Sequence, residues 1–509
     1  MKRYAVSVVL GASLILLSAC GHTSGGPTNN APSATGSVRA VFAGTSAALI
    51  PWVDDPDMWE TFSFQVLSQP INGTASVVSN QLLYTPSSAF KSGTDNFTYQ
   101  ATDHGGATVT GVAAVRVFSS TALSVCTTTG TVNADGTINT RTKSNQCTFY
   151  SVGTTRVTNN GTGVTMDYFI NWPSNASAPK AVVVLIGGAN LNMNFSGDTT
   201  LGVPDSSGGG NFLVRTAQLF AEAGYLTVAI NRPSDLPTNA TNADADQYRI
   251  SVNHAVDILT VLKHINTQNL PVFLAGTSHG AISAVAANLI ATGISLSSPV
   301  TNNSDNPSNL YVGDPNIANL KTSFVQRPVH VLWNTNDLCS VAPPAGSQTL
   351  CNSLSGAMCN SVSGGLEVTT PGNGVTSSDI GPCQSYDFHG YFGIETAAVS
   401  NITNWLNGEV AALAGNHPPE TAFATVATAA GVSIQTNLAT LTRDQDGDAL
   451  SYALSHTTTS LGGSVTINGS TVTYSPPPGV SNKTDYYVYI ANDGRGGVGA
   501  GVITVQIGN

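Results

Sequence analysis

The chain carries two copies of one sequence pattern, one near each end. Residues 54–118 and 444–508 align without a gap at a constant offset (444 − 54 = 390). The first copy reads TDNFTY at 94–99, and the second reads TDYYVY at 484–489. Alternating aromatic and polar residues, separated by Gly, Pro, Asn and Asp, are typical of half-buried strands joined by turns. The repeat therefore predicts two all-β sandwiches with a different region between them.

Length and charge restrict the remaining possibilities. A chain of 509 residues is too long for one hydrophobic core and is expected to hold about three domains. Only 9% of the residues are charged, and the formal net charge is −11. Such a chain offers no basic surface to neutralise nucleic-acid phosphates, so we expect no nucleic-acid partner.

The N-terminus has the parts of an export signal. The segment 1–3 is basic, Ala5 to Leu17 is apolar, and small residues precede Cys20. The apolar run is shorter than the roughly 17 to 25 residues of a membrane-spanning helix. The ending Leu-Ser-Ala-Cys resembles a bacterial lipoprotein signal, which implies a lipid anchor on Cys20. With Gly21 next, the resemblance implies the outer membrane or cell surface; a simple secretory signal is the alternative.

The other cysteines number six, and an even number is typical of disulfides in an exported chain. Many pairings are open to six cysteines. Closeness in sequence favours Cys126 with Cys147 and Cys351 with Cys359, which leaves Cys339 with Cys383.

Residues 165–412 differ from both ends. Apolar runs of strand length alternate there with helical patterns, which predicts a mostly parallel sheet with helices on both faces. The expected strands are 181–186, 225–230, 271–275 and 328–333, and the expected helices are 212–223, 249–265 and 281–291.

One turn in this region has a special sequence, Gly-Thr-Ser-His-Gly at 276–280, between an expected strand and an expected helix. Small residues are needed at Gly276 and Gly280 because larger side chains would collide across such a tight bend. The turn would expose the hydroxyl of Ser278 at the carboxyl edge of the sheet. It resembles the nucleophile elbow of the α/β-hydrolase fold; an ordinary glycine-rich turn is the alternative.

A serine hydroxyl becomes a nucleophile only beside a base that is held by an acid. In α/β-hydrolases the order is Ser, acid, His. Three histidines follow Ser278 by enough chain to return to it. His417 lies in the linker segment Asn-His-Pro-Pro and His456 in the second repeat, so His389 is the candidate base.

Two carboxylates compete for the role of acid. Asp337 directly follows an expected strand, where the resemblance places the acid, and Asp387 is the second choice because it lies two residues from His389. A Cys339–Cys383 bridge would tie the acid loop to the base loop. The expected oxyanion hole consists of the backbone N–H of His279 with that of Gly188 or Ala189. The loop that follows the expected strand 181–186 resembles the His-Gly-Gly loop of esterases, with Ile186 in place of its histidine. The side chain of His279 is expected in the pocket wall.

The repeats resemble bacterial cadherin-like and Ig-like modules, which share a Tyr-x-Pro, a later Asp-x-Phe/Tyr-x-Tyr and a glycine-rich Asp turn; here DHGG and DGRGG supply the turn. Asp444, Asp446 and Asp448 alternate as in a calcium loop, because alternate carboxylates can face one hard cation. The resemblance therefore implies a candidate structural calcium site in the second copy, whereas the first copy lacks the alternation.

Together these features predict a multidomain chain, with a central α/β-hydrolase domain between two all-β Ig/cadherin-like sandwiches. The divisions are 1–20 signal peptide, 21–36 linker, 37–120 sandwich, 121–164 β-rich connector, 165–412 α/β-hydrolase domain and 413–509 sandwich. The expected function is an exported carboxylic ester hydrolase of the cell envelope, which forms an acyl-enzyme without a catalytic cofactor. Its expected partners are an ester substrate, the membrane through the lipid, and a surface polymer or protein through the modules. A serine peptidase of the same fold, or an adhesion protein with an inactive hydrolase domain, is the alternative.

Overall fold

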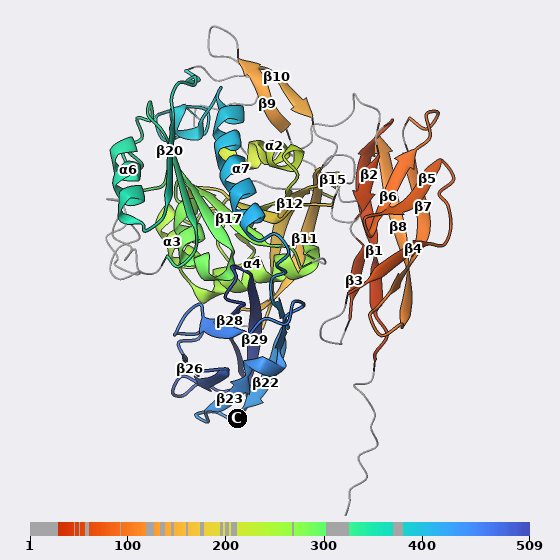
Figure 1. The fold of residues 1–509 in the computed structure, drawn as a ribbon, viewed down its shortest axis with the longest axis vertical. Coiled ribbons are helices and arrows are strands. Elements are labelled where there is room, and N and C mark those ends of the chain that lie inside the picture. Colours follow the sequence, from red (N-terminus) through yellow and green to blue (C-terminus); the bar gives the residue numbers. More distant parts are fainter. Residues whose placement is uncertain are drawn as a thin grey trace, which may run out of the picture.

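The computed structural model consists of a central α/β domain with one β-rich module beside it and another below it (Figure 1). It describes residues 29–509 apart from 45, 50, 56–60, 92, 119–126, 133–137, 144–146, 159–160, 174–177, 194–196, 199–202, 205–210, 267–268, 302–324 and 370–379. The expected signal peptide and Cys20 therefore lie outside the described residues. Within the described part of the chain, none of the helices has the length and apolar character needed to span a membrane.

An eight-stranded sheet forms the centre of the molecule, in the order β11-β12-β16-β13-β17-β18-β19-β20. From β16 to β20 all neighbours pair in parallel, whereas β11 and β12 add an antiparallel edge. The strands are β11 (Cys147–Val157), β12 (Gly163–Asn171), β13 (Val182–Ile186), β16 (Leu226–Pro233), β17 (Val272–Thr277), β18 (Gly293–Ser297), β19 (Val329–Asn334) and β20 (Met358–Val362).

Helices cover both faces of this sheet. Val182 and Val184 of β13 join a core cluster with α4 and α5, while Val183 and Leu185 join a second cluster with α1, α2 and α7. The helices are α1 (Phe212–Arg215), α2 (Ala217–Glu222), α3 (Asn242–Arg249), α4 (Val252–Ile265), α5 (Gly280–Ala286), α6 (Pro344–Ser353) and α7 (Glu395–Ala412). A strand buried on both sides reads as a continuous apolar run, as 181–186 does. The expected fold class is confirmed.

Several details differ from the sequence prediction. The helix expected over 212–223 is divided into α1 and α2, and the helix expected over 281–291 ends at Ala286. The range 121–164, expected to be a connector, contains β11 and the start of β12, which belong to the central sheet. Its short β-type patterns could not show which sheet its strands join. The helix expected over 249–265 starts at Val252 instead, and Arg249 ends a separate helix, α3. A capping box at Thr241 and Asp244 starts α3, each side chain accepting from the other's backbone amide.

The two terminal modules have related topologies. The first contains sheets β3-β1-β8-β7-β4 and β2-β6-β5, and the second contains β22-β29-β28-β25 and β23-β27-β26, with a short β21-β24 pair. The sequence offset recurs in the strands, because β28 begins 390 residues after β7 (483 − 93). The strands are β1 (Ser33–Phe42), β2 (Ala47–Leu49), β3 (Trp52–Asp54), β4 (Ser63–Val66), β5 (Gly73–Val78), β6 (Gln81–Pro86), β7 (Gly93–Thr102), β8 (Thr108–Phe118), β21 (Glu420–Thr421), β22 (Ala424–Thr428), β23 (Ile434–Asn437), β24 (Thr442–Arg443), β25 (Ser451–Leu454), β26 (Ser464–Asn468), β27 (Thr471–Ser475), β28 (Lys483–Asn492) and β29 (Val498–Ile507).

A buried Tyr–Asp pair explains part of the repeated pattern. In the first module the hydroxyl of Tyr84 donates to Asp95 over 3.0 Å. In the second, Tyr474 donates to Asp485 over 2.9 Å. Each carboxylate also accepts a backbone amide from a loop, that of Asn72 in the first copy and Leu461 in the second. A buried carboxylate needs such partners, so the pair fixes one loop of each sandwich to its core.

The C-terminal module shares a hydrophobic core with the central domain. Tyr486 and Val488 of β28 and Val502 of β29 belong to the cluster that contains α4. The backbone N–H of Val157 in β11 donates to the hydroxyl of Tyr486 over 3.0 Å. The module is therefore packed onto the central domain as a structural part of it.

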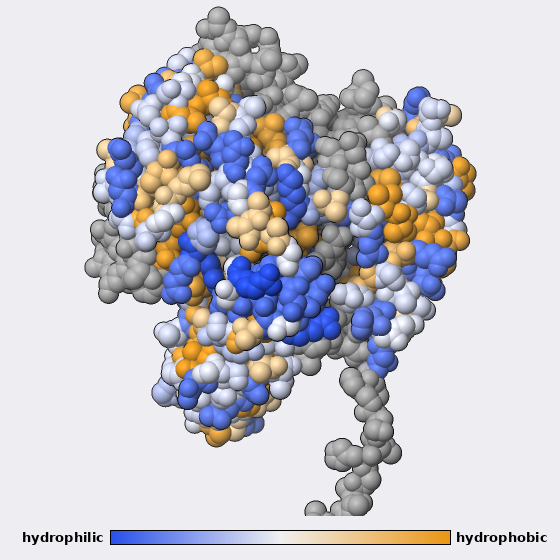
Figure 2. Space-filling view, in the orientation of Figure 1, coloured by the Kyte–Doolittle hydropathy of each residue, from blue (hydrophilic) through white to orange (hydrophobic). Residues whose placement is uncertain are grey.

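The N-terminal module contacts the central domain at Trp172, whose indole Nε1 donates to Oε1 of Gln81 over 2.8 Å. Figure 2 shows apolar side chains gathered on the outer part of this module. Its large exposed apolar residues are Leu67, Ile71, Val77, Val78 and Val112.

The shared core makes a prediction about stability. Tyr486 faces the central domain, whereas its neighbour Tyr487 lies in the core of the module itself. We expect Tyr486→Ala to cost about 3–5 kcal/mol of unfolding free energy and to destabilise the central domain directly. The 413–509 segment has no tryptophan, so tryptophan fluorescence during urea unfolding reports on the rest of the chain. The fluorescence midpoint should fall further for Tyr486→Ala than for the control Tyr487→Ala; an unchanged midpoint for Tyr486→Ala would contradict the shared core.

Candidate active site

Ser278 occupies a strained turn between β17 and α5. Its φ is 53°, in the left-handed region that residues other than glycine rarely adopt. Hydrogen bonds hold this conformation: the N–H of Ser278 donates to the carbonyl of Ser297 in β18 over 3.0 Å, and its carbonyl accepts from Ala281 over 3.1 Å. Strain of this kind persists only where the surroundings enforce it, and it is concentrated at functional sites.

Glycines permit the backbone to come close on both sides of this turn. A Cβ atom at Gly276 would lie 2.1 Å from the carbonyl oxygen of Gly280, and a Cβ at Gly280 would lie 2.2 Å from that of Ile186. A Cβ at Gly188 would lie 2.9 Å from the Cβ of Ser278. The two small residues are thus required by contact, as the sequence predicted, and the loop after β13 lies directly against the serine.

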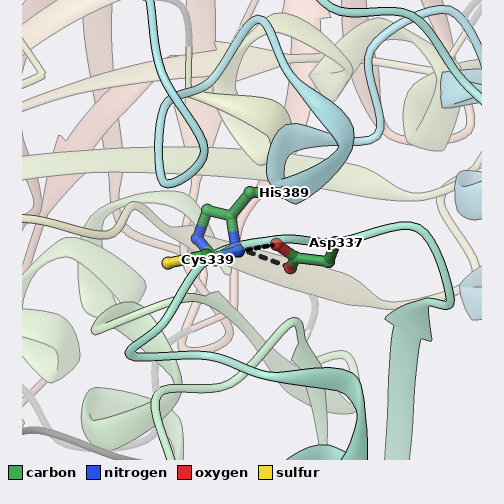
Figure 3. Close-up of side chains that lie close together, drawn as sticks. All are labelled: Asp337, Cys339 and His389. Atoms are coloured by element: carbon green, nitrogen blue, oxygen red, sulfur yellow. Dashed lines mark hydrogen bonds and ion pairs between the residues drawn. The ribbon is translucent and has the colours of Figure 1, made fainter.

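His389 and Asp337 face each other in the structure. Nδ1 of His389 is 2.8 Å from Oδ2 of Asp337, and both residues are 5% exposed (Figure 3). The other carboxylate oxygen of Asp337 accepts the backbone N–H of Cys339 over 2.8 Å. Asp337 comes just after β19, so its carboxylate is fixed by a rigid strand and by its own loop. This arrangement orients the imidazole and favours its Nδ1–H tautomer.

Asp387, the second choice for the acid, has a different role in the structure. Its carboxylate accepts the backbone N–H of Phe388 over 2.5 Å and caps the short helix η6 (Phe388–Gly390) that carries His389. Burial raises the pKa of Asp387 above its ordinary value. Of the other histidines considered, His417 pairs with Asp446, and Nε2 of His456 contacts the carbonyl of Ile250.

The loop that carries His389 is held by residues that the sequence analysis missed. Arg215 of α1 donates to the carbonyl of Gly390 over 2.5 Å and pairs with Glu395 over 3.1 Å. The side-chain amide of Asn334, at the end of β19, donates to the carbonyl of Phe388 over 3.0 Å. The sequence signal for this contact was Arg215 itself, which follows three apolar residues at 212–214, because a charge on a buried helix needs a partner.

Hydrogen bonds between loops bring the serine turn and the histidine loop to the same edge of the sheet. Ser278 bonds to Ser297, and the next residue, Ser298, bonds to Leu332 of β19 through its N–H over 2.8 Å. The hydroxyls of Ser298 and Tyr391, two residues after His389, are 3.0 Å apart. Nε2 of His389 is buried and makes no hydrogen bond within the described residues. A buried ring nitrogen without a partner is free to bond a substrate or nucleophile.

Three backbone amides beside Ser278 are also without acceptors. Among the described residues, the N–H groups of Gly188, Ala189 and His279 donate to no carbonyl or side chain. Ala189 has a φ of 44°, and Leu191 follows with 64°. These amides are the ones that the sequence analysis expected to form an oxyanion hole.

Two disulfides lie in the central domain, one between two loops and one between α6 and β20. Cys339 is bonded to Cys383, and Cys351 is bonded to Cys359. These are two of the pairings expected from the sequence, whereas Cys126 of the third pair lies outside the described residues. The first bridge joins the acid loop to the segment that leads to His389. Asp337, Cys339 and His389 lie close enough for a metal site, but the Cys339 sulfur is consumed by the disulfide and cannot be a thiolate ligand.

The three carboxylates of the expected calcium loop lie close together. Oδ1 of Asp444 accepts the backbone N–H groups of Asp446 and Asp448. The imidazole of His417 is 2.9 Å from Asp446, and Arg495 is 3.0 Å from Asp448. All three carboxylates thus have hydrogen-bonding or cationic partners with which a calcium ion would compete. Calcium binding stays a prediction.

Comparisons with known proteins agree with this domain arrangement. The family described as bacterial Ig domain matches residues 29–116 and 416–506. The chain has Ig-like domains at both ends. Among curated proteins no match was found.

Solved structures with 12–14% identity are similar to the central part of the chain. Est1E from Butyrivibrio proteoclasticus aligns with a TM-score of 0.31 and 12% identity, over 51% of this chain and 100% of its own. A Xanthomonas campestris protein, titled as an α/β serine hydrolase without a lid, has a TM-score of 0.30, 14% identity, and coverages of 51% and 95%. A cold-adapted esterase from an Arctic intertidal metagenomic library aligns with a TM-score of 0.30 and 12% identity, over 53% of this chain and 96% of its own.

The disulfide between the acid and base loops leads to a prediction about stability and activity, for which removal of the second disulfide is the control. Replacing Cys339 and Cys383 by serine removes a covalent tie across 44 residues. We expect a loss of about 4 kcal/mol in stability. We also expect a fall of about 10-fold or more in kcat for ester hydrolysis, because small displacements of catalytic groups are costly.

The control is the double serine variant of Cys351 and Cys359, which bridge only eight residues. Its kcat should stay within about 2-fold of that of the wild type. Equal kcat values for the two double variants would show that the Cys339–Cys383 bridge has no part in aligning the site.

Proposed function

We propose that this chain is an exported carboxylic ester hydrolase in which Ser278, His389 and Asp337 form the catalytic triad. The observation that carries the proposal is the buried Asp337–His389 pair, whose free Nε2 lies at the sheet edge that also presents the strained Ser278. A base oriented by an acid, beside a serine on a tight strand-to-helix turn, is the arrangement that activates a hydroxyl.

The reaction follows from these positions. Oγ of Ser278 attacks the ester carbonyl while its proton passes to Nε2 of His389, and Asp337 stabilises the imidazolium through Nδ1–H. The oxyanion accepts from the amide of His279 and from those of Gly188 or Ala189. The imidazolium then protonates the departing alkoxide, which leaves an acyl group on Ser278. Water, deprotonated by His389, releases the acid and restores the serine.

An ester is proposed before a peptide because an alkoxide is a better leaving group than an amine anion, so an ester makes the smaller demand on general-acid catalysis. A serine peptidase uses the same groups and is the nearest alternative. The other alternative, an adhesion protein with an inactive hydrolase domain, would give no reason for a strained Ser278 or for a buried His–Asp pair.

The location of the protein belongs to the same proposal. Disulfides persist in oxidising compartments, and the two bridges support export to the cell envelope. We propose that a lipid on Cys20 anchors the chain to the outer membrane or cell surface. The exposed apolar side chains of the N-terminal module, such as Ile71 and Val112, are proposed to contact a polymer or protein.

Steady-state hydrolysis of p-nitrophenyl acetate and butyrate by residues 21–509 tests the proposal. We expect Ser278→Ala and Asp337→Asn each to lower kcat by about 10⁴-fold, because each removes one member of a unit that acts together. The matched control is Asp387→Asn, which should stay within a few-fold of wild type. If Asp387→Asn caused the larger loss, the acid would be misassigned. A folded, oxidised wild type without activity on either ester would refute the esterase proposal.

A further inference from the structure

A buried arginine on α3 contacts the loop that lies against Ser278. Arg249 is 1% exposed, and its Nη2 lies 3.0, 3.1 and 2.9 Å from the carbonyl oxygens of Gly187, Gly188 and Ala189. Its Nη1 donates to Oγ of Ser283 in α5 over 2.8 Å. One guanidinium thus gathers three consecutive carbonyl groups and joins them to the helix that follows the serine.

These contacts determine where the amides of the loop point. In a planar trans peptide the N–H lies opposite the C=O of the preceding residue. The carbonyls of Gly187 and Gly188 point toward Arg249, so the N–H groups of Gly188 and Ala189 point away from it. Those two amides have no acceptor among the described residues, and the Cα of Gly188 lies against Ser278.

The same arginine is connected to the other proposed oxyanion donor. Nε of Arg249 is 3.3 Å from Oδ1 of Asp246, which is fully buried. The other oxygen of Asp246 lies 2.9 Å from Nδ1 of His279, the residue after the serine. Asp246 therefore forms a hydrogen bond with the imidazole of His279 and an ion pair, without a hydrogen bond to Nε, with Arg249. Burial lowers the pKa of Arg249 to about 10, so the guanidinium is still charged at neutral pH.

We propose that Arg249 and Asp246 are positioning residues that fix both halves of the oxyanion hole, the amides of Gly188 and Ala189 through Arg249 and the amide of His279 through Asp246. This inference rests on the proposed ester hydrolase function. It also accounts for the left-handed φ of Ala189, since three charge-assisted hydrogen bonds to successive carbonyls offset the strain of that conformation. Neither residue touches the reacting atoms; each acts through the backbone groups that it orients.

A purely structural ion pair would have different kinetic consequences. An oxyanion hole binds the tetrahedral transition state more tightly than the planar ester, so losing its alignment lowers kcat and leaves KM nearly unchanged. A pair that only stabilises the fold changes the amount of active protein and leaves the kcat of each active site unaltered. The difference is therefore measurable once active sites are counted.

The test compares Arg249→Lys and Arg249→Gln with the control Arg156→Lys. Arg156 is also a buried arginine that pairs with carboxylates, Asp257 at 2.7 Å and Asp235 at 2.9 Å. Active sites are counted by stoichiometric fluorophosphonate labelling. Then kcat and KM are measured with p-nitrophenyl acetate, and Ki with a trifluoromethyl ketone, which forms a tetrahedral oxyanion on the serine.

We expect both Arg249 variants to lose about 10²- to 10³-fold in kcat per active site, with KM within about 3-fold of wild type. The Ki should rise by a factor similar to the loss in kcat, because the tetrahedral inhibitor binds more weakly. Arg156→Lys should change kcat per site by less than about 3-fold. Unchanged kcat per site in the Arg249 variants, or a rise in KM with unchanged Ki, would overturn the inference.

A variant at Asp246 keeps the inference testable if the Arg249 variants do not fold, and a rescue experiment adds a second readout if Arg249→Ala folds. Asp246→Asn keeps the size of the side chain and removes its charge, and we expect the same fall in kcat and the same rise in Ki; wild-type values would overturn the inference. In folded Arg249→Ala, added guanidinium ion should restore part of kcat, whereas no recovery in Arg249→Ala would count against positioning by the guanidinium. The activity of the wild type distinguishes failure of the proposed function from failure of this inference. An inactive, unlabelled wild type refutes the proposed function, while an active wild type with equally active Arg249 variants refutes only this inference.

Discussion

The close approach of three backbone segments around Ser278 is the constraint on which the rest of the central domain depends. The end of β13, the turn after β17 and the start of α5 meet so tightly that a Cβ at Gly276 or Gly280 would overlap a neighbouring peptide. This contact forces Ser278 into a left-handed conformation and places the loop at Gly188 against it. A serine held in this way cannot turn away from the sheet edge, so the groups that serve it must be brought to that edge by other means.

Those groups are held by different kinds of bond. A covalent bridge and a buried carboxylate hold His389, through Cys339–Cys383 and Asp337. Buried charge holds the loop on the opposite side, through Arg249 and Asp246. The C-terminal Ig-like domain packs against α4, the helix that follows Arg249 after a two-residue break, and closes the core beneath it. The flanking domain is therefore part of the support of the candidate site.

Much of this could be predicted from the sequence, because the signals were local. The repeat, the apolar run of β13 and the glycines around Ser278 each report on a short segment whose geometry they restrict. The sequence ranked Asp337 before Asp387 because Asp337 follows an expected strand, and the fold shows that Asp337 faces the imidazole. The sequence placed Arg249 at the start of one helix over 249–265, because its apolar periodicity did not show that α3 ends at Arg249 and that α4 begins at Val252. The packing of Tyr486 on α4 depends on how domains meet, which no local pattern encodes.

Covalent labelling of the serine tests the central claim most directly. The oxidised chain 21–509 and its Ser278→Ala variant would be treated with a fluorophosphonate, digested, and analysed by mass spectrometry for the modified peptide. An activated nucleophile predicts one phosphonylated site, on Ser278, and none in the variant. Folded wild-type protein that stays unlabelled, or label on another serine in both proteins, would contradict the account of Ser278, His389 and Asp337 as a working triad.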